Sequence, residues 1–365
     1  MHVPDGYLSP QTCLVGAAVA VPAMAVAARR MSRVVKTRNL PTLATLAAMS
    51  FLVMMFNVPV PDGTTAHAVG GVLIAICLGP WAAVVALSVA LLLQALLFGD
   101  GGVLAYGVNV VNLAVVLPFV GYGVYRLVAG GSALASRHRV VAAAVGGYVG
   151  LNAAALAYGV ELGIQPDLFT TTGGAPLYSP YHLSQTIPAM LLAHLTVAGA
   201  AEAVLTAGVV AYLQRADLAL LRLNHLGVAL DGCATLPRPR RITAARAAFA
   251  FVATMVMLTP LGLLAPGEAF GETAPSDLDL GSLGLSSIPA GLERYNGFWS
   301  HTLLGGYGFG SGQNATLGYL LSAAVGIVVI SLAVLVVWLA VRFVGGSRSD
   351  RVPGSEQPAP VGGRA

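Results

Sequence analysis

Long apolar runs alternate along the chain with short polar or turn-rich segments. A membrane-spanning helix needs about 20 predominantly apolar residues. The apolar block at 67–98 is too long for one helix and is broken by Gly-Pro-Trp at 79–81, so it divides into a short span and a longer one. The pattern predicts nine spans, at about 12–28, 41–58, two within 67–98, 106–128, 140–158, 185–213, 247–264 and 316–341.

Basic residues between the runs orient these spans. The first run ends in RRMSRVVKTR, which holds Arg29, Arg30, Arg33, Lys36 and Arg38. Such a block belongs in the cytoplasm, so the N-terminus is predicted to lie outside. Alternation then places NVPVPDGTTAH, the GDGG at 99–102 and the turn-rich segment 265–314 on the outer face, and the C-terminus in the cytoplasm.

Composition supports an all-α, polytopic membrane protein. Hydrophobic residues make up 56% of the 365 residues and charged residues only 9%, with a mean hydropathy of +0.79, whereas a soluble domain has about 25% charged residues. The net charge of +4 does not indicate a nucleic-acid partner; the apolar composition makes the lipid bilayer the expected partner. Cys13, Cys77 and Cys233 lie far apart and predict neither a disulfide framework nor a thiolate metal site.

A polar segment at 224–246, which contains RPRR, is the best domain boundary and is predicted to be a cytoplasmic linker. It separates a seven-span domain at 1–223 from a two-span domain at 247–344, whose segment 265–314 lies outside. The tail at 345–365 is rich in Gly, Pro and Ser and is predicted to be disordered in the cytoplasm.

The N-terminal sequence MHVPDGYLSP carries the first candidate chemistry. It lacks the basic start and small-residue cleavage site of a signal peptide, and because His2 is large we expect Met1 to be retained. The amine of Met1, the backbone nitrogen of His2 and a ring nitrogen of His2 can then close a five-membered and a six-membered chelate in one plane. Planar nitrogen coordination favours Ni(II) or Cu(II). The alternative is adventitious binding, since any exposed Met-His terminus binds some divalent metal.

His67 is the natural fourth nitrogen, because the predicted topology places it on the same outer face. The alternative is that His67 caps the helix that follows GTTA. Asn57, Asp62 and Asn109 are candidates to hold the ligands in place, since ligating histidines need hydrogen-bond acceptors. They could equally form turns or bonds between helices.

Four segments together resemble the CbiM/NikM family, the substrate-capture subunits of energy-coupling-factor importers for cobalt and nickel. They are MHVPDGYLSP, NVPVPDGTTAHAVGGVLIAICLGPW, LLLQALLFGDGG and YGVNVVNLAVV, and the resemblance covers 1–213. In that family the N-terminal amine, the amide and imidazole of the second residue, and a later histidine hold the metal. The resemblance therefore implies Met1, His2 and His67 as ligands.

The C-terminal third is similar to the two-span accessory subunit of such systems, which occurs separate or fused. TPLGLLAPGEAFGE and PAGLERYNGFW resemble its outer segment, which carries a Pro-Asp-Gly-Leu-Glu motif. Here Ala290 stands where that motif has Asp, so any role of that carboxylate does not transfer.

The leading hypothesis is a transport subunit that captures Ni(II) or Co(II), with the ion as cargo and no resident cofactor. The sequence has no G-x-x-x-x-G-K-[ST] loop, so ATP would be hydrolysed by partner ATPases acting through a transmembrane coupling subunit. The alternative is a carrier driven by an ion gradient, with Glu202 or His194 in a relay, although no internal repeat supports it. None of the seven histidines has the spacing of a metalloenzyme helix.

Two further pairs of polar residues stay open. His194 and Glu202 lie eight residues apart, about two helical turns, and could share a face; pairing between helices is the simpler interpretation. Glu293 and His301 lie in the outer segment and could pass metal to the site, or could be solvated loop residues.

Overall fold

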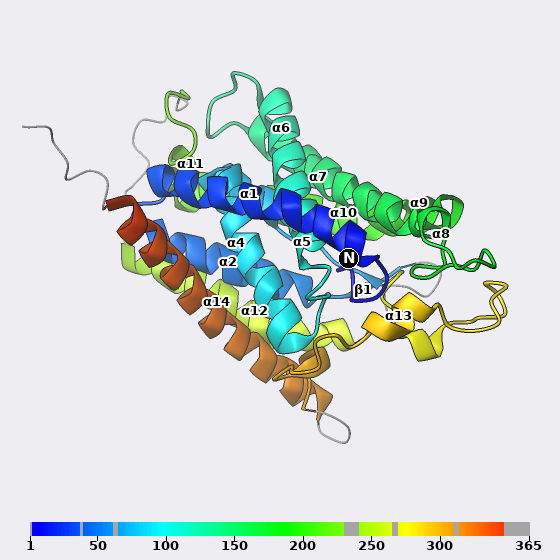
Figure 1. The fold of residues 1–365 in the computed structure, drawn as a ribbon. Coiled ribbons are helices and arrows are strands. Elements are labelled where there is room, and N and C mark those ends of the chain that lie inside the picture. The colour runs from blue at the N-terminus through cyan, green and yellow to red at the C-terminus, as the bar shows by residue number, and fades with distance from the viewer. Residues whose placement is uncertain are drawn as a thin grey trace, which may run out of the picture.

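The computed structural model describes residues 2–36, 39–60, 65–229, 241–264, 269–309 and 314–346. These residues form a helical bundle with one small hairpin, in which β1 (Val58–Pro59) pairs antiparallel with β2 (Thr65–Ala66). The all-α prediction is therefore confirmed for this part of the chain. Figure 1 shows the N-terminal segment, β1 and α13 together toward one end of the bundle, and α11 with the C-terminal ends of α1 and α14 at the other.

The helices follow in three stretches of chain. The first contains α1 (Pro10–Val34), α2 (Leu40–Met54), α3 (Gly71–Leu78), α4 (Pro80–Leu93), the π-helix η2 (Gln94–Phe98), α5 (Tyr106–Asn109), the π-helix η3 (Val110–Val116) and α6 (Leu117–Ala129). The second contains α7 (Arg137–Gly163), α8 (Gln165–Leu168), α9 (Leu183–Ala193), the π-helix η4 (His194–Ala198), α10 (Gly199–Ala216) and α11 (Leu218–Arg222). The third contains α12 (Arg241–Leu258), α13 (Ala290–Tyr295), α14 (Ala315–Gly346) and the 3₁₀ turns η5 (Thr259–Leu264), η6 (Pro275–Asp277) and η7 (Gly305–Tyr307).

Within the described ranges, six helical segments are long and apolar enough to cross a membrane. They are Pro10–Met31, Pro80–Phe98, Tyr106–Ala129, Arg137–Leu168, Leu183–Ala216 and Ala315–Phe343, with shorter apolar helices at Leu40–Met54 and Ala250–Leu264. The short span predicted at the start of 67–98 is α3, whose eight residues reach only about 12 Å. α3 is buried along its whole length and lies inside the bundle. The count of nine spans and the orientation of the termini stay predictions.

Glycine and proline set the break between α3 and α4. Gly79 has a φ of 92°, in the region that favours glycine, and Pro80 begins α4. This is the break that the sequence predicts at Gly-Pro-Trp. Small residues also bring α6 and α7 together, since a Cβ on Gly121 would lie 2.7 Å from the carbonyl oxygen of Gly146.

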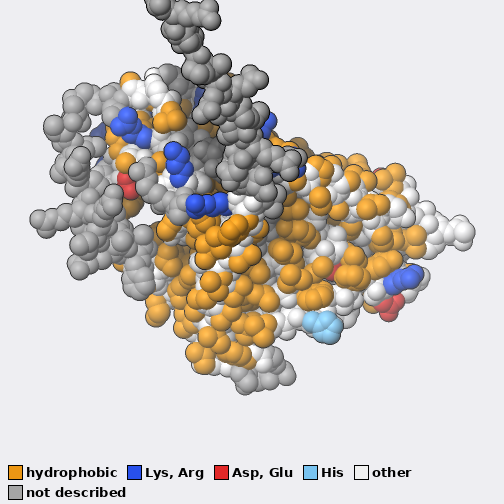
Figure 2. All heavy atoms as spheres, turned by 60° about the vertical axis from the view of Figure 1, so that its left-hand side comes forward, with side chains coloured by type: hydrophobic (Ala, Val, Ile, Leu, Met, Phe, Trp, Pro, Cys, Tyr) orange, Lys and Arg blue, Asp and Glu red, His pale blue; other side chains and the backbone are white. Residues whose placement is uncertain are grey.

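The C-terminal helices pack on the first half of the chain. α14 lies along α2, α4 and α1, and the ring of Phe51 on α2 lies against the backbone of α14 at Gly326. Figure 2 shows hydrophobic side chains over the middle of one face, with Lys and Arg gathered toward its ends. Exposed apolar residues such as Leu127, Val204 and Val328 fit contact with lipid. The predicted linker and tail fall mainly at 230–240 and 347–365, outside the described residues.

Candidate metal site

The N-terminal segment is folded into the bundle. His2 is 2% exposed and Val3 is fully buried. The Val3 N–H donates to Asn109 Oδ1 at 2.8 Å, and its carbonyl accepts from Asn109 Nδ2 at 3.1 Å and from the Gly102 N–H at 2.7 Å. These three bonds fix the backbone next to His2 against Asn109, the last residue of α5, and the loop before this helix.

Asp5 makes a second anchor on the same loop. Its carboxylate accepts hydrogen bonds from the backbone N–H groups of Val103, Leu104 and Ala105 at 3.0, 2.8 and 3.2 Å. Burial raises the pKa of Asp5, and these three bonds oppose that rise. Asp5 thus joins the N-terminal segment to the turn before α5, beyond the turn role that its Pro-Asp-Gly sequence indicates.

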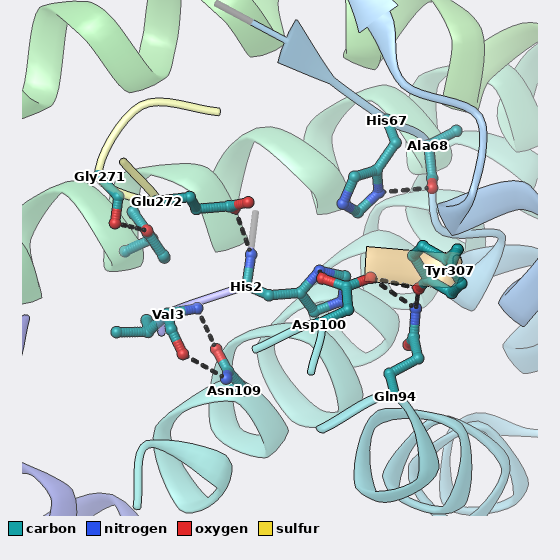
Figure 3. Close-up of polar contacts among 11 residues, drawn as sticks. His2, Val3, His67, Ala68, Gln94, Asp100, Asn109, Gly271, Glu272 and Tyr307 are labelled. Carbon is teal, nitrogen blue, oxygen red and sulfur yellow. Dashed lines mark hydrogen bonds and ion pairs between the residues drawn. The ribbon is translucent and has the colours of Figure 1, made fainter. Parts of the chain in front are cut away.

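Both N–H groups of His2 donate to carboxylates (Figure 3). The backbone N–H donates to Glu272 Oε1 at 2.8 Å, and Nδ1 lies 2.9 Å from Asp100 Oδ1. A carboxylate can only accept, so Nδ1 carries the proton in this arrangement. Nε2 is buried and has no hydrogen-bond partner among the described residues.

His67 follows the β1–β2 hairpin directly and faces His2. The two rings are stacked, with centroids 5.0 Å apart and planes 22° from parallel. His67 Nδ1 lies 3.0 Å from the carbonyl of Ala68, which can only accept, so the lone pair of the neutral ring is on Nε2. Burial lowers the pKa of His67 well below its usual value, which keeps the ring neutral, as a metal ligand must be.

Asp100 joins His2 to the C-terminal part of the chain. The Tyr307 hydroxyl donates to Asp100 Oδ2, and Gln94 Nε2 donates to Asp100 Oδ2 at 3.2 Å and to the Tyr307 oxygen at 3.1 Å. Burial alone would raise the pKa of Asp100, but His2 and Tyr307 hold it well below its usual value. The carboxylate is therefore ionised and orients the His2 ring.

A cavity of about 220 Å³ lies beside these groups. Its walls come from both halves of the sequence: His2, Met54, Asn57, His67, Phe98, Gly99 and Asp100 from the first, and Glu272, Gly306, Tyr307 and Tyr319 from the second. The segment around α13 also packs on the N-terminus, because a Cβ on Gly6 would lie 2.7 Å from the Leu292 carbonyl oxygen. The C-terminal part therefore closes one side of the cavity.

Comparison with known proteins identifies the family. The family model CbiM, described as the cobalt uptake substrate-specific transmembrane region, matches residues 2–220. The chain belongs to the CbiM family. It is therefore a multi-pass membrane protein of a nickel and cobalt transport family.

Relatives extend the similarity over nearly the whole chain. The fused nickel transport protein NikMN of Rhodobacter capsulatus is 46% identical over 346 residues, which cover 90% of this chain and 95% of that protein. The probable fused nickel transport protein LarMN of Lactiplantibacillus plantarum is 43% identical over 92% of this chain and 96% of its own length. A crystal structure of a truncated transition metal transporter is 56% identical, covers 58% of this chain and 98% of its own, and superposes with a TM-score of 0.55. The fused arrangement predicted from the sequence is thus confirmed.

The structure of this CbiM-family protein brings together only some of the predicted site residues. His2 and His67 meet, and Asn57 lines the cavity. Asn109 holds the backbone of Val3 and does not bond to either imidazole. Met1 and Asp62 lie outside the described residues. Among the described residues, no three His, Cys, Asp or Glu side chains are grouped as a metal site.

Other predicted candidates lie away from the cavity. Glu293 and His301 are exposed and do not line it, and the His301 ring packs edge-on against Trp299. Ala290 begins α13, and the next two N–H groups of that helix donate to the Leu177 carbonyl. This backbone contact holds α13 in place without the Asp of the family motif.

Sequence reasoning missed three residues of the site: Asp100, Glu272 and Tyr307. Asp100 lies in the GDGG segment that marks the family, so the signal for it was present. Glu272 and Tyr307 come from the turn-rich outer segment, where no local pattern distinguishes them from Glu268 or Tyr295. Their contacts with His2 and Asp100 span more than 200 residues of sequence.

Proposed function

We propose that this chain is the substrate-binding membrane subunit of an ATP-driven energy-coupling-factor importer of Ni(II) or Co(II). The ion binds through the amine of Met1, the amide and imidazole of His2, and the imidazole of His67. The observation that carries this proposal is the meeting of two buried imidazoles, from the N-terminus and from the hairpin that precedes α3, beside one cavity. The relatives named as nickel and cobalt transport proteins support the choice of ion.

The donor chemistry explains the preference for these ions. His67 presents the Nε2 lone pair, because Nδ1 is bonded to the Ala68 carbonyl. With the two nitrogens of His2 and the terminal amine, the set is four nitrogens without a carboxylate. Such a set suits Ni(II) far better than the oxygen-seeking Mg(II), so Mg(II), which is abundant, does not compete.

Two hydrogen bonds of His2 must be broken before the same nitrogens can bind a metal ion. The six-membered chelate uses the amide nitrogen and Nδ1, and both are now N–H donors to Glu272 and Asp100. Coordination therefore removes the amide proton and moves the ring proton from Nδ1 to Nε2. Binding should release protons and weaken at low pH.

Energy for import comes from partner chains in this proposal. The chain supplies capture, while partner ATPases and a transmembrane coupling subunit reorient it in the bilayer. A gradient-driven carrier would need titratable groups available within the membrane. The two candidates are engaged in the bundle: His194 Nδ1 bonds the Met190 carbonyl at 2.7 Å, and Glu202 accepts two backbone N–H groups. Their other polar atoms, His194 Nε2 and Glu202 Oε1, are buried without a hydrogen-bond partner among the described residues, but neither residue lines the cavity beside His2 and His67.

His67→Ala tests the site directly. Loss of the fourth nitrogen should weaken nickel binding at least tenfold, about 1.4 kcal/mol, and shift the absorption of the bound ion toward a weaker ligand field. If His67 only caps a helix, the spectrum and affinity stay as in the native protein and stability falls by about 1 kcal/mol. Nickel titration of the purified full chain at neutral pH separates these outcomes.

Uptake tests the energy source. Cells that express the chain with its partner ATPases should accumulate nickel or cobalt, and cells that express it with ATPases inactivated by mutation should not. Accumulation that is independent of ATPase activity and collapses with the proton gradient would instead support the carrier.

A further inference from the structure

The loop that carries His67 is held from within the membrane by one carboxylate. Glu202 lies on α10 and is fully buried. Its Oε2 accepts the backbone N–H groups of Val69 and Gly70, both at 2.8 Å. These residues are the second and third after His67 and lead directly into α3.

The same loop is held on its other side by α2. The Ser50 hydroxyl donates to the Val69 carbonyl, so the backbone N–H and carbonyl of Val69 are bonded to side chains from different helices. Gly70 has a φ of 76° and is the N-cap residue that precedes α3, so the chain turns sharply at this point. The backbone between the ring of His67 and α3 thus has few ways to move while Glu202 is in place.

An ionisable side chain buried in a membrane bundle is costly and is retained where it has a function. Ion pairing does not account for Glu202, because its two hydrogen bonds on Oε2 come from backbone N–H groups of the His67 loop. The His67 ring in turn bonds the Ala68 carbonyl of this loop. The position of its Nε2 therefore depends on the backbone that Glu202 holds.

We propose that Glu202 is a positioning residue for His67: through Val69 and Gly70 it fixes the loop that aims the imidazole at His2. This inference rests on the proposed function, in which His67 binds nickel. Glu202 would thereby couple α10 to the capture site, since a movement of α10 would move the backbone next to the proposed ligand His67.

The test uses the purified full chain and Ni(II) alone. Glu202→Ala should weaken nickel binding at least tenfold and shift the absorption of the bound ion in the same direction as His67→Ala. Glu202→Gln should bind within about threefold of the native protein, because its amide oxygen still accepts both N–H groups. Glu161→Ala is the matched control: it removes another carboxylate of a membrane helix, one that bonds Asn112 at 2.6 Å, and should leave affinity and spectrum unchanged.

A double-mutant cycle shows whether Glu202 acts through His67. In the His67→Ala background, Glu202→Ala should cause no further loss of affinity, because the ligand that it positions is gone. Should Glu202→Ala fail to fold, Glu202→Asp replaces it in the same cycle, since the shorter side chain withdraws the acceptor but keeps the carboxyl group.

Two results would overturn the proposal: native affinity and spectrum in Glu202→Ala, or an equal loss of affinity in both backgrounds. Failure of the proposed function is separate, because it appears as a native spectrum in His67→Ala itself.

Discussion

Tyr307 is the residue through which the C-terminal part of the chain reaches the His2 side chain. Its hydroxyl donates to Asp100, which holds His2 Nδ1, and its ring is stacked on Phe98 with centroids 5.1 Å apart. The ring packs on Phe98 and the hydroxyl holds Asp100, so removal of the hydroxyl oxygen alone separates the two contributions.

Tyr307→Phe should weaken nickel binding about tenfold, at the lower end of the effect of changes around a metal ligand, because Asp100 without this hydroxyl accepts more strongly from the His2 Nδ1–H that coordination must displace. The packing on Phe98 is kept, so the thermal midpoint of unfolding should change little. Isothermal titration with nickel and a thermal unfolding scan measure both. Tyr106→Phe removes a hydroxyl bonded to the Ser88 carbonyl at 3.0 Å and should leave affinity unchanged. Equal losses in the two variants would assign Tyr307 a purely structural role.

One added residue before Met1, or acetylation of its amine, should abolish tight nickel binding and leave the protein folded. The extension moves the amine away from the amide of His2 and leaves only imidazole donors, which the five-membered chelate cannot replace. Nickel titration of chains with native and extended N-termini, with size-exclusion chromatography as the folding check, measures this. Equal affinities would contradict the terminal chelate.

At the scale of elements, the N-terminal segment is buried at one end of the bundle and hydrogen-bonded to it. It is held by α5 and the preceding loop, through Asn109, Gly102 and the backbone groups that bond Asp5. The residues that hold the segment are therefore different from the proposed metal ligands.

Asn109→Ala should lower both nickel affinity and stability. The Val3 N–H would be buried without an acceptor, which costs about 1–3 kcal/mol, and the backbone next to His2 would loosen. Asn112→Ala, one turn further along, removes a bond to Glu161 instead and should reduce stability without changing nickel affinity. Chemical unfolding and nickel titration of both variants distinguish the positions. A native affinity in Asn109→Ala would show that the other anchors suffice.

The places of the helices could be predicted from the sequence because membrane helices are long apolar runs, and the break at Gly79 is local. The length of α3 could not, since α3 and the end of a true span are equally apolar; burial in protein and burial in lipid select the same side chains. The pairing of His2 with His67 followed from topology and resemblance. The contacts of Glu272 and Tyr307 depend on how two distant segments fold against each other, which no local pattern encodes.

At the scale of the whole molecule, deletion of everything after about residue 224 should impair nickel loading and uptake while the first membrane domain still inserts. The reason is structural: Glu272, Tyr307 and Tyr319 form one wall of the cavity beside His2 and His67, and this wall would be lost. The full-length double variant Glu272→Gln, Tyr307→Phe is the matched control and should reproduce part of the defect. Full uptake by the truncated chain would show that the C-terminal part is dispensable.

The cavity wall shared by the two halves has a consequence for how the transporter responds to its own abundance. A segment tethered to the site that it closes experiences an effective concentration of about millimolar order, far above what a separate small membrane subunit reaches by expression alone. In this chain, Glu272 and Tyr307 therefore close the cavity by an intramolecular step, whose rate does not depend on the concentration of a second subunit. Its extent is independent of the copy number of the protein, so every molecule in a sparsely populated membrane carries both parts of the cavity wall.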